Sequence, residues 1–496
     1  MLSPRNIRWD STVDILVIGY GLAGAVAAIT AHEKGARVAI LEKQNADSHF
    51  SSSSLSGGLF VSSSDVEGAA EYMQALYCSG EGPNWTDRET IRVLAEYSAQ
   101  NSGWIQGLGG KAIFLCRAAE HSQLPGARSM ELWEYRGKGF RMMQFMYRQV
   151  LDRQIEVLYG TPAERLLTEE TGRVTGVRAI AAGGEERGWI NYKAEKAVII
   201  CSGGFEANED MKLQYLKLYP SYFTGGASNT GDGIRMAQEV GADLWHMNCV
   251  SARLVAKFLE FPVAFNIGFT AKNWNRHHML GRREKGEAGY IIVDRYGCRY
   301  LNENFKGHAA YYELTHFDTH RLEHPRVPSY YIFDRRRMES GALCTGGLSG
   351  PQQLYKWSHD NMAELSMGWI IKGETVGDLA EKIGITPSSL EKTVQRWNAH
   401  CSAGSDPDFG RNPLDQVPLD RPPFYAVRLF PGGPNTQGGP RRNSLAQVIN
   451  PFGESIPGLY SAGECGSVYG MLYPVSGGNL AECIAFGRLA AENALK

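Results

Sequence analysis

Residues 14–42, DILVIGYGLAGAVAAITAHEKGARVAILE, decide the fold of this chain. The run over 14–18 is mostly apolar and rich in β-branched residues, which predicts a buried parallel strand. A glycine-rich turn, a helix over 25–34 and a second strand over 36–41 follow. The second strand ends at Glu42, so the stretch predicts a βαβ unit that closes on an acidic residue.

The turn carries the pattern GxGxxG at Gly19, Gly21 and Gly24. The first glycine permits the tight turn, the second lets the backbone approach a pyrophosphate, and the third lets the helix pack closely on the strand. The helix N-terminus offers N–H groups and a favourable dipole to phosphate. Glu42 follows Gly24 by 18 residues, where a carboxylate can accept both ribose hydroxyls. The segment therefore predicts dinucleotide binding.

Composition bounds the remaining possibilities. The chain has 496 residues, of which 43% are hydrophobic and 21% charged, an ordinary globular composition that excludes intrinsic disorder. At roughly 150 residues per domain, this length predicts two large or three smaller units. The net charge of −2 gives no strong field, so we expect neither nucleic acid nor an anionic membrane as a partner.

Cysteine usage and hydropathy predict the compartment. The nine cysteines contain no CxxC pair, which argues against a disulfide framework or structural zinc and favours a reducing cytoplasm. The apolar stretch over 15–29 lacks a basic flank and is too short and glycine-rich to span a bilayer. The adjacent His277 and His278 cannot easily share one ion. We therefore expect a cytoplasmic protein without a targeting sequence, an integral membrane segment or a metal.

The rest of the chain predicts a discontinuous domain. A β-meander is expected over 166–201, a strand pair over 290–303, and helices within 377–384 and 387–401. A last strand, GLYSAGE over 458–464, leads to a C-terminal helix that begins at 477. We expect one nucleotide-binding domain formed by residues 1–250 and 426–496, with residues 251–425 inserted as a second domain.

The C-terminal strand and helix favour FAD over NAD. Glu464 ends a small-small-acid turn, where it could bind the ribityl or diphosphate region. The helix-start N–H groups after Gly477 could meet the flavin N1–C2=O edge, where negative charge develops on reduction. Taken alone, the same pattern is that of an ordinary strand–turn–helix with capping glycines.

At this point the chain resembles the FAD-dependent fumarate reductase / 3-ketosteroid dehydrogenase family over nearly its whole length. The resemblance implies FAD, an α/β fold with a Rossmann-like, glutathione-reductase-like FAD domain, and an inserted α+β cap. It also implies hydride transfer between a substrate carbon and flavin N5, with a proton exchanged at the neighbouring carbon. The motifs that carry it are DILVIGYGLAG…LEK, SSLSGG (Ser53–Gly58), ICSGGFEAN (Ile200–Asn208), NTGDGIRMA (Asn229–Ala237), VDRYGCRYLNEN (Val293–Asn304), PPFYAV (Pro422–Val427), IPGLYSAGE and SGGNLAECIAFGRLAA.

These motifs and the resemblance predict the cofactor contacts. His49 precedes the serine loop with an offset that does not match relatives in which a histidine carries the flavin, so we expect FAD to be non-covalent. The predicted FAD-binding residues are Gly19, Gly21, Leu22, Ala23, Gly24, Glu42, Lys43, Ser54, Ser56, Gly57, Gly58, Ser202, Gly203, Gly204, Asn229, Gly231, Asp232, Gly463, Glu464, Gly478, Asn479 and Leu480.

The polar residues expected over the flavin separate the two branches of the family. Fumarate reductases resemble one another in three polar residues. An arginine in the cap acts as the acid, an arginine in the C-terminal glycine motif holds a carboxylate, and a histidine precedes the Gly-Gly where the chain returns from the cap. Here Gly286 falls at the first position, Ser476–Leu480 has no arginine, and Asn435–Gln437 has no histidine. A desolvated dicarboxylate needs cationic partners, although Lys285, Arg441 and Arg442 lie nearby in the sequence.

The steroid branch carries Tyr-Pro-x-x-Gly, which this chain matches from Tyr473 to Gly477. In that branch the tyrosine hydroxyl and the glycine N–H bind the ketone oxygen and stabilise an enolate. A cap tyrosine takes the α-proton, and Tyr311, Tyr312 or His308 is the candidate here. Alternatively, Tyr473 is an aromatic residue that only packs on the flavin edge.

These considerations predict an FAD-dependent enzyme that desaturates an apolar cyclic ketone of the 3-ketosteroid type, or reduces the enone, with an external electron acceptor or donor. The aromatic run over 258–274 lacks a clean period, which favours a pocket for an apolar polycycle over cap core. One alternative is fumarate-reductase-like reduction of a small unsaturated carboxylate. Another is an electron-transfer flavoprotein, which the missing haem and iron–sulfur motifs and the large insertion disfavour.

Overall fold

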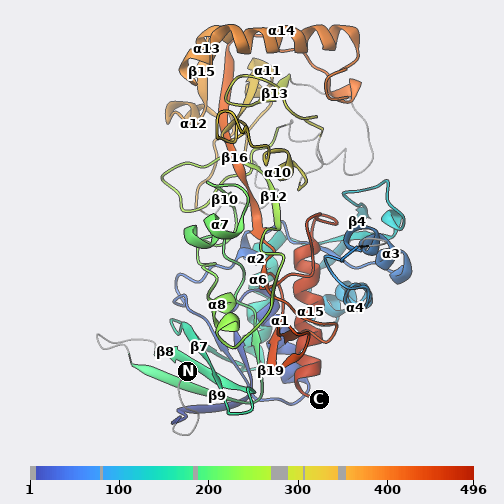
Figure 1. The fold of residues 1–496 in the computed structure, drawn as a ribbon, viewed down its shortest axis with the longest axis vertical. Coiled ribbons are helices and arrows are strands. Elements are labelled where there is room, and N and C mark those ends of the chain that lie inside the picture. The colour runs from blue at the N-terminus through green and yellow to red at the C-terminus, as the bar shows by residue number, and fades with distance from the viewer. Residues whose placement is uncertain (1–6, 79–81, 182–187, 270–288, 305–307, 345–353) are drawn as a thin grey trace. The chain divides into compact units, whose positions relative to one another are not determined.

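The computed structural model describes residues 7–78, 82–181, 188–269, 289–304, 308–344 and 354–496. The chain divides into two compact units (Figure 1). Unit 1 comprises Met1–Leu216, Gly225–Ser251 and Asn435–Lys496, and unit 2 comprises Lys217–Thr224 and Ala252–Pro434.

These bounds differ from the expected ones in two places. The long strand β16 (Phe424–Thr436) pairs with β14 (Ser329–Asp334) from Phe424 to Leu429, so its first part belongs to unit 2. The second difference arises at β10 (Tyr222–Phe223), which pairs in parallel with Gly432 and Gly433 of β16. Strand pairing, which composition does not reveal, therefore places the boundary after Pro434 and transfers Lys217–Thr224 to unit 2.

A parallel sheet with the order β19-β9-β1-β2-β6 forms the centre of unit 1. Its apolar strands are buried on both faces; Ile15, Leu16 and Val17 of β1, for example, are fully buried. An antiparallel extension joins β8 to β9 and β7 to β8, and β18 pairs with β19. The strands are β1 (Ser11–Ile18), β2 (Val38–Leu41), β6 (Glu156–Leu158), β7 (Ala163–Thr168), β8 (Val174–Ile180), β9 (Trp189–Ile200), β18 (Gln447–Ile449) and β19 (Ser455–Ser461).

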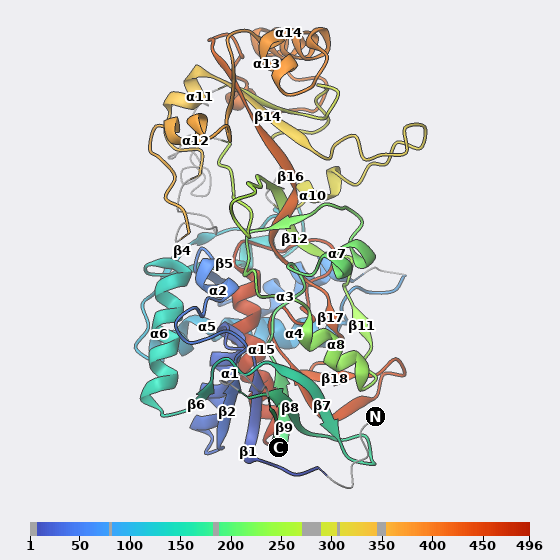
Figure 2. The same cartoon turned by 90° about the vertical axis from the view of Figure 1, so that its left-hand side faces the viewer.

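Helix α1 (Leu22–Glu33) packs against α15 (Gly478–Ala494), and α6 (Lys138–Asp152) lies beside α1 (Figure 2). The approach of α1 and α15 is close because α15 carries a glycine: a Cβ on Gly487 would lie 2.9 Å from the Ala23 carbonyl oxygen. Both helices are buried almost all round, as expected of helices inside a large domain.

Smaller elements complete unit 1. The strands β3 (Leu59–Val61), β4 (Ala112–Arg117) and β5 (Glu131–Tyr135) form a sheet of their own, and β11 (Leu244–Trp245) pairs with β17 (Gly439–Pro440). The remaining helices are α2 (Ser52–Leu55), α3 (Val66–Tyr77), α4 (Arg88–Ala99), α5 (Asn101–Gly107), η2 (Ala127–Ser129), α7 (Glu209–Tyr215) and α8 (Asp232–Glu239).

Unit 2 contains a mixed sheet around β16, to which β14 pairs antiparallel and β10 pairs parallel. Strands β12 (Val250–Val255) and β15 (Ile371–Gly373) also pair with β16, and β13 (Tyr290–Val293) pairs with β14. Apolar side chains of α13 (Val376–Lys382) and α14 (Pro387–Ala403) pack on β13 and β14, including Leu379, Leu390 and Trp397. The other helices are α10 (Ala310–Glu313), α11 (Arg335–Glu339), α12 (Met362–Ser366) and η3 (Pro413–Asp415).

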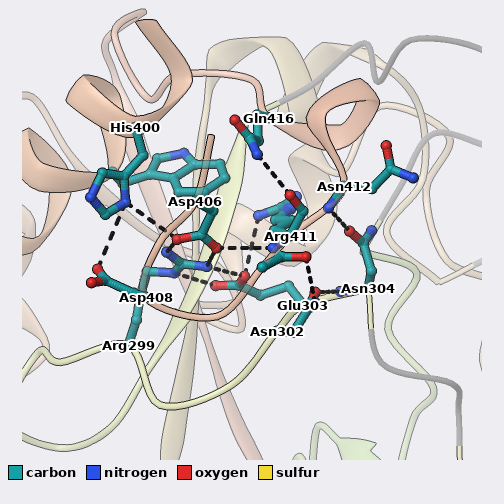
Figure 3. Close-up of polar contacts among 12 residues, drawn as sticks. Arg299, Asn302, Glu303, Asn304, His400, Asp406, Asp408, Arg411, Asn412 and Gln416 are labelled. Atoms are coloured by element: carbon teal, nitrogen blue, oxygen red, sulfur yellow. Dashed lines mark hydrogen bonds and ion pairs between the residues drawn. The ribbon is translucent and has the colours of Figure 1, made fainter. Parts of the chain in front are cut away.

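The strand pair expected over 290–303 is wrong in its second half. Only an isolated bridge joins Val293 to Arg299, and the true partner of β13 is β14. The segment turns away because Arg299 donates hydrogen bonds to Glu303 and Asp406 in a buried ion network (Figure 3).

The aromatic run packs against other aromatic rings where the structure describes it. Phe258 stacks on Trp369 with ring centroids 4.2 Å apart, and Phe265 packs between these rings and Trp357. The rings of Phe258, Phe265, Trp357 and Trp369 thus bury one another within unit 2. The interpretation of residues 258–274 as a pocket wall stays a prediction, and 270–274 lie outside the described residues. Over the described parts of the chain, every helix is too short or too polar to cross a bilayer.

Candidate active site

A cavity in unit 1 opens at the carboxyl ends of β1, β2, β9 and β19. This is the edge at which open parallel sheets bind nucleotides. Twelve of the predicted FAD-binding residues line the cavity: Gly19, Gly21, Leu22, Ala23, Glu42, Lys43, Ser202, Gly203, Asn229, Asp232, Gly463 and Glu464.

The glycine-rich turn has the geometry that a dinucleotide needs. A Cβ on Gly24 would lie 2.0 Å from the Gly19 carbonyl oxygen, so the close approach of α1 to β1 requires glycine. Gly19 itself has φ +98° and lies against Cys201. The N-terminus of α1 has no side-chain cap and opens on the cavity at Gly21. These residues fit a bound diphosphate.

Glu42 lies at the end of β2 and is buried. Its carboxylate accepts hydrogen bonds from the backbone N–H groups of Tyr20 and Gln44, both at 2.9 Å. Burial acts to raise the pKa of Glu42, but the neighbouring His49 and the hydrogen bonds from these amides hold it below the usual range. Glu42 is therefore an ionised acceptor, as recognition of ribose hydroxyls requires.

His49 is a cavity residue whose role at this site was not predicted. Its Nε2 lies 3.6 Å from Glu42 Oε2, and its ring stacks on Tyr20 with centroids 5.4 Å apart. Tyr147 and Tyr159 complete this aromatic cluster. The sequence drew attention to His49 only in connection with covalent flavin attachment. Its position beside Glu42 had no signal in the sequence, because only folding brings the two residues together.

Lys43 and Asp232 line the same cavity. Lys43 Nζ lies 2.6 Å from Asp232 Oδ2 and 2.7 Å from Thr230 Oγ1. Burial acts to raise the pKa of Asp232, but Lys43 and Thr230 lower it below the usual range. This ion pair links β2 to α8 across 189 residues of sequence.

The serine loop contributes different residues from those predicted. Ser51, Ser52 and Ser53 line the cavity, and the Ser53 hydroxyl accepts from the Leu22 N–H at 3.3 Å. The cavity lining does not include the following predicted residues, whose assignment to FAD stays a prediction: Gly24, Ser54, Ser56, Gly57, Gly58, Gly204, Gly231, Gly478, Asn479 and Leu480.

Tyr473 lies at the N-terminus of α15. Its hydroxyl oxygen accepts a hydrogen bond from the Asn479 N–H at 2.7 Å. Gly477, with φ +90°, precedes the helix and could not carry a side chain, because a Cβ would lie 2.6 Å from the Leu59 carbonyl. The structure thus brings the predicted Tyr473 and the first turn of α15 together.

A group of three amide side chains adjoins this helix start. Asn479 donates to Asn435 Oδ1 at 2.5 Å and accepts from Gln437 Nε2 at 3.1 Å. The two arginines that the sequence left available for a carboxylate are both paired: Arg441 with Asp243 and Arg442 with the buried Glu482.

Unit 2 holds the other candidates for proton exchange. Tyr311 on α10 is fully buried, and its ring meets that of Tyr312 edge-on at 5.5 Å. His308 is also buried, and its Nε2 lies 3.1 Å from Arg253 Nη2. Sequence reasoning missed Arg253, which has no motif around it. Lys285 and Gly286 lie outside the described residues.

One group of side chains has the spacing of metal ligands within the described residues. It consists of His400, Asp406 and Asp408 in unit 2. Figure 3 shows these three side chains turned toward one another, but Arg299 holds Asp406 and Arg396 holds Asp408 in two-point contacts. The carboxylates are thus already neutralised. His277 and His278 lie outside the described residues.

These features define a protein that binds a dinucleotide at the carboxyl edge of a parallel sheet. Residues 14–480 match the family FAD_binding_2, an FAD binding domain, and the chain belongs to this family. It binds FAD, and the expected flavoprotein fold is confirmed.

Comparison with known proteins gives relatives in both branches. A probable fumarate reductase of Shewanella frigidimarina is 27% identical over 98% of this chain and 75% of its own length. A 3-oxosteroid 1-dehydrogenase of Mycolicibacterium smegmatis is 30% identical over 68% of this chain and 58% of its own length. The crystal structure of a 3-ketosteroid Δ1-dehydrogenase from Sterolibacterium denitrificans shares the fold, with a TM-score of 0.82 and 22% identity over 98% of this chain and 99% of the other. The protein is therefore an FAD-dependent oxidoreductase of the fumarate reductase / 3-ketosteroid dehydrogenase family.

Proposed function

We propose that the protein forms a carbon–carbon double bond next to a ketone, or reduces such a bond in the reverse reaction, in a 3-oxosteroid or a similar apolar cyclic ketone. The observation that carries this proposal is the contact between the Tyr473 hydroxyl and the Asn479 N–H at the start of α15. A phenol oxygen that accepts such a bond becomes a stronger donor toward a carbonyl oxygen.

The proposed roles follow from the chemistry of an enolate. Tyr473 and the Gly477 N–H bind the ketone oxygen and stabilise the negative charge that develops when the α-proton leaves. A unit 2 group, Tyr311, Tyr312 or His308, exchanges that proton. Bound FAD supplies the acceptor or donor of the β-hydride. An external electron carrier completes the turnover.

The neutral surroundings of α15 support a ketone over a dicarboxylate. Asn435, Gln437 and Asn479 are amides, and Arg441 and Arg442 are engaged by Asp243 and Glu482. Among the described residues around the start of α15, a desolvated carboxylate would find only arginines that are already paired. The position of His49 beside Glu42, which we assign to the adenosine ribose, supports non-covalent FAD, because a ribose contact lies at the opposite end of the cofactor from the flavin ring.

The test is anaerobic reduction of the enzyme's flavin by a saturated 3-oxosteroid, followed by visible absorption. We expect loss of the oxidised flavin bands, and a rate about 10²–10³-fold lower in Tyr473→Phe, as for loss of one oxyanion donor. Tyr460→Phe is the matched control, since Tyr460 is also buried and binds the far end of α15 through the Asn493 carbonyl. Equal rates in Tyr473→Phe and the wild type would refute the assigned role.

The Arg253–His308 contact favours a second candidate, reduction of a small unsaturated carboxylate, because an arginine beside a histidine can bind a carboxylate and deliver a proton. Chemically reduced enzyme would then be reoxidised by fumarate. Arg253→Met would slow that reaction and Tyr473→Phe would not. Reoxidation by an enone but not by fumarate would exclude this candidate.

A further inference from the structure

Glu206 and Glu464 form a carboxyl pair at the FAD cavity. Glu464 follows β19 and lines the cavity, whereas Glu206 follows β9 and is buried behind it. One amide group serves both carboxylates: Asn229 Nδ2 donates to Glu206 Oε1 at 3.2 Å and to Glu464 Oε2 at 3.3 Å. The two acids thus share their principal donor.

The remaining oxygens of the two acids converge on Gly204. Glu464 Oε1 lies 2.2 Å, and Glu206 Oε2 3.0 Å, from the point where a Cβ on Gly204 would stand. Thr436 donates to Glu464 Oε1 at 3.1 Å. Glu206 Oε2, in contrast, is buried without a hydrogen-bond partner among the described residues. A buried carboxylate oxygen beside a second carboxylate is satisfied when one proton lies between them.

The charges around the pair do not neutralise two anions. The titratable groups that face it are Lys212 on α7, Cys465 after β19 and Cys483 on α15. Lys212 Nζ already pairs with Glu209 at 2.7 Å. Burial raises the pKa of Glu206 to about 7, and burial together with repulsion from Glu206 raises the pKa of Glu464 well above its usual range.

We propose that Glu206 and Glu464 hold one proton between them when FAD is bound, and that Glu206 is the positioning residue that keeps this proton at Glu464. The FAD diphosphate adds negative charge to the same cavity, so FAD favours the protonated pair. When the pair loses its proton, two carboxylates and the diphosphate repel one another and FAD is released more readily. The proposal rests on FAD binding and is independent of the substrate.

The first test measures FAD release from the diluted holoenzyme by flavin fluorescence between pH 6 and 9.5. For the wild type we expect a constant Kd at low pH and a rise of up to about tenfold per pH unit once the pair titrates, the slope for one linked proton. Glu206→Gln should bind FAD with a flat profile, because Glu464 then stays a single anion. Glu239→Gln removes an exposed carboxylate of α8 that pairs with Arg165 and is the control.

The second test counts protons on the unmodified protein. FAD is released from the holoenzyme at pH 8 in weak buffer that contains an indicator dye, and up to one proton per FAD should appear in solution. No proton from the wild type, or the same pH slope in Glu206→Gln as in the wild type, would overturn the proposal.

Discussion

At the scale of single residues, the cofactor site depends on glycines at positions where a Cβ would collide with the backbone. Gly24 lies in the first turn of α1, where a methyl group would stand 2.0 Å from the Gly19 carbonyl oxygen and 3.4 Å from Val17. The atom it meets is backbone, which cannot move without displacing the turn that lines the FAD cavity. The same turn positions Tyr20 N–H to bind Glu42, so its displacement affects two contacts at once.

We therefore expect Gly24→Ala to lower the free energy of unfolding of unit 1 by about 1–3 kcal/mol, as overpacking does, and to weaken FAD retention. Gly103→Ala is the matched control, because Gly103 also lies in a helix, α5, with nothing within 4 Å of the added Cβ. That change should stabilise the protein by about 0.4–1 kcal/mol. Urea unfolding and flavin fluorescence after desalting measure both effects. Equal flavin retention by the two variants would contradict this account.

At the scale of elements, α15 connects the cofactor site to the core. The helix begins at the Tyr473–Asn479 contact and is buried almost throughout. Its Glu482 forms an ion pair with Arg442 in which both side chains are at most 1% exposed. Burial lowers the pKa of Arg442 to about 10, so the guanidinium is still charged at neutral pH.

Removal of one partner leaves the other charge buried and unpaired, so Arg442→Met should destabilise the protein by about 3–5 kcal/mol. The double variant Arg442→Met/Glu482→Leu should recover most of this loss, because it removes both charges and keeps the volume. The double-mutant cycle is measured by chemical unfolding. A double variant less stable than Arg442→Met would show that the pair itself, and not the stranded charge, is what matters.

At the scale of the whole molecule, a different interaction contributes to the stability of each unit. Unit 1 gains stability from FAD, which binds only its folded state. Unit 2 contains the ion network in which Arg299, Glu303 and Asp406 are at most 5% exposed. Burial acts to raise the pKa of Asp406, but the Arg299 guanidinium lowers it to about 2.

Because this folded-state pKa lies below the unfolded value of about 3.9, the contribution of Asp406 to stability is complete above about pH 4 and is lost as the pH falls toward 2. Asp406→Asn should therefore destabilise unit 2 at pH 7 and flatten its acid unfolding. Asp408→Asn should cost less, since Asp408 is 20% exposed and its partner Arg396 is 66% exposed. Urea midpoints at pH 7, 4 and 3 test this. An acid limb unchanged in Asp406→Asn would contradict it.

Much of the fold could be predicted because its signals are local. Hydrophobic periodicity and glycine spacing within one short stretch suffice to recognise each of these features: the βαβ unit, the GxGxxG turn, Glu42 and the helix that begins near Gly477. The sequence did not predict which strands pair with each other or which side chains far apart in the chain pack together. The partner of β13 is β14 and not the segment after Cys298, and Phe258 stacks on Trp369, 111 positions further along the chain.

The sequence by itself determined that this protein is an FAD-binding α/β oxidoreductase with an inserted second unit, because the phosphate-binding turn and the order of the family motifs need no tertiary information. Only the tertiary structure decided which distant residues meet. His49 reaches Glu42, Lys43 reaches Asp232, and Arg441 and Arg442 are taken by other acids. Glu206 and Glu464, 258 positions apart, face a common amide. Their chemistry arises from burial and proximity, which a linear sequence does not contain.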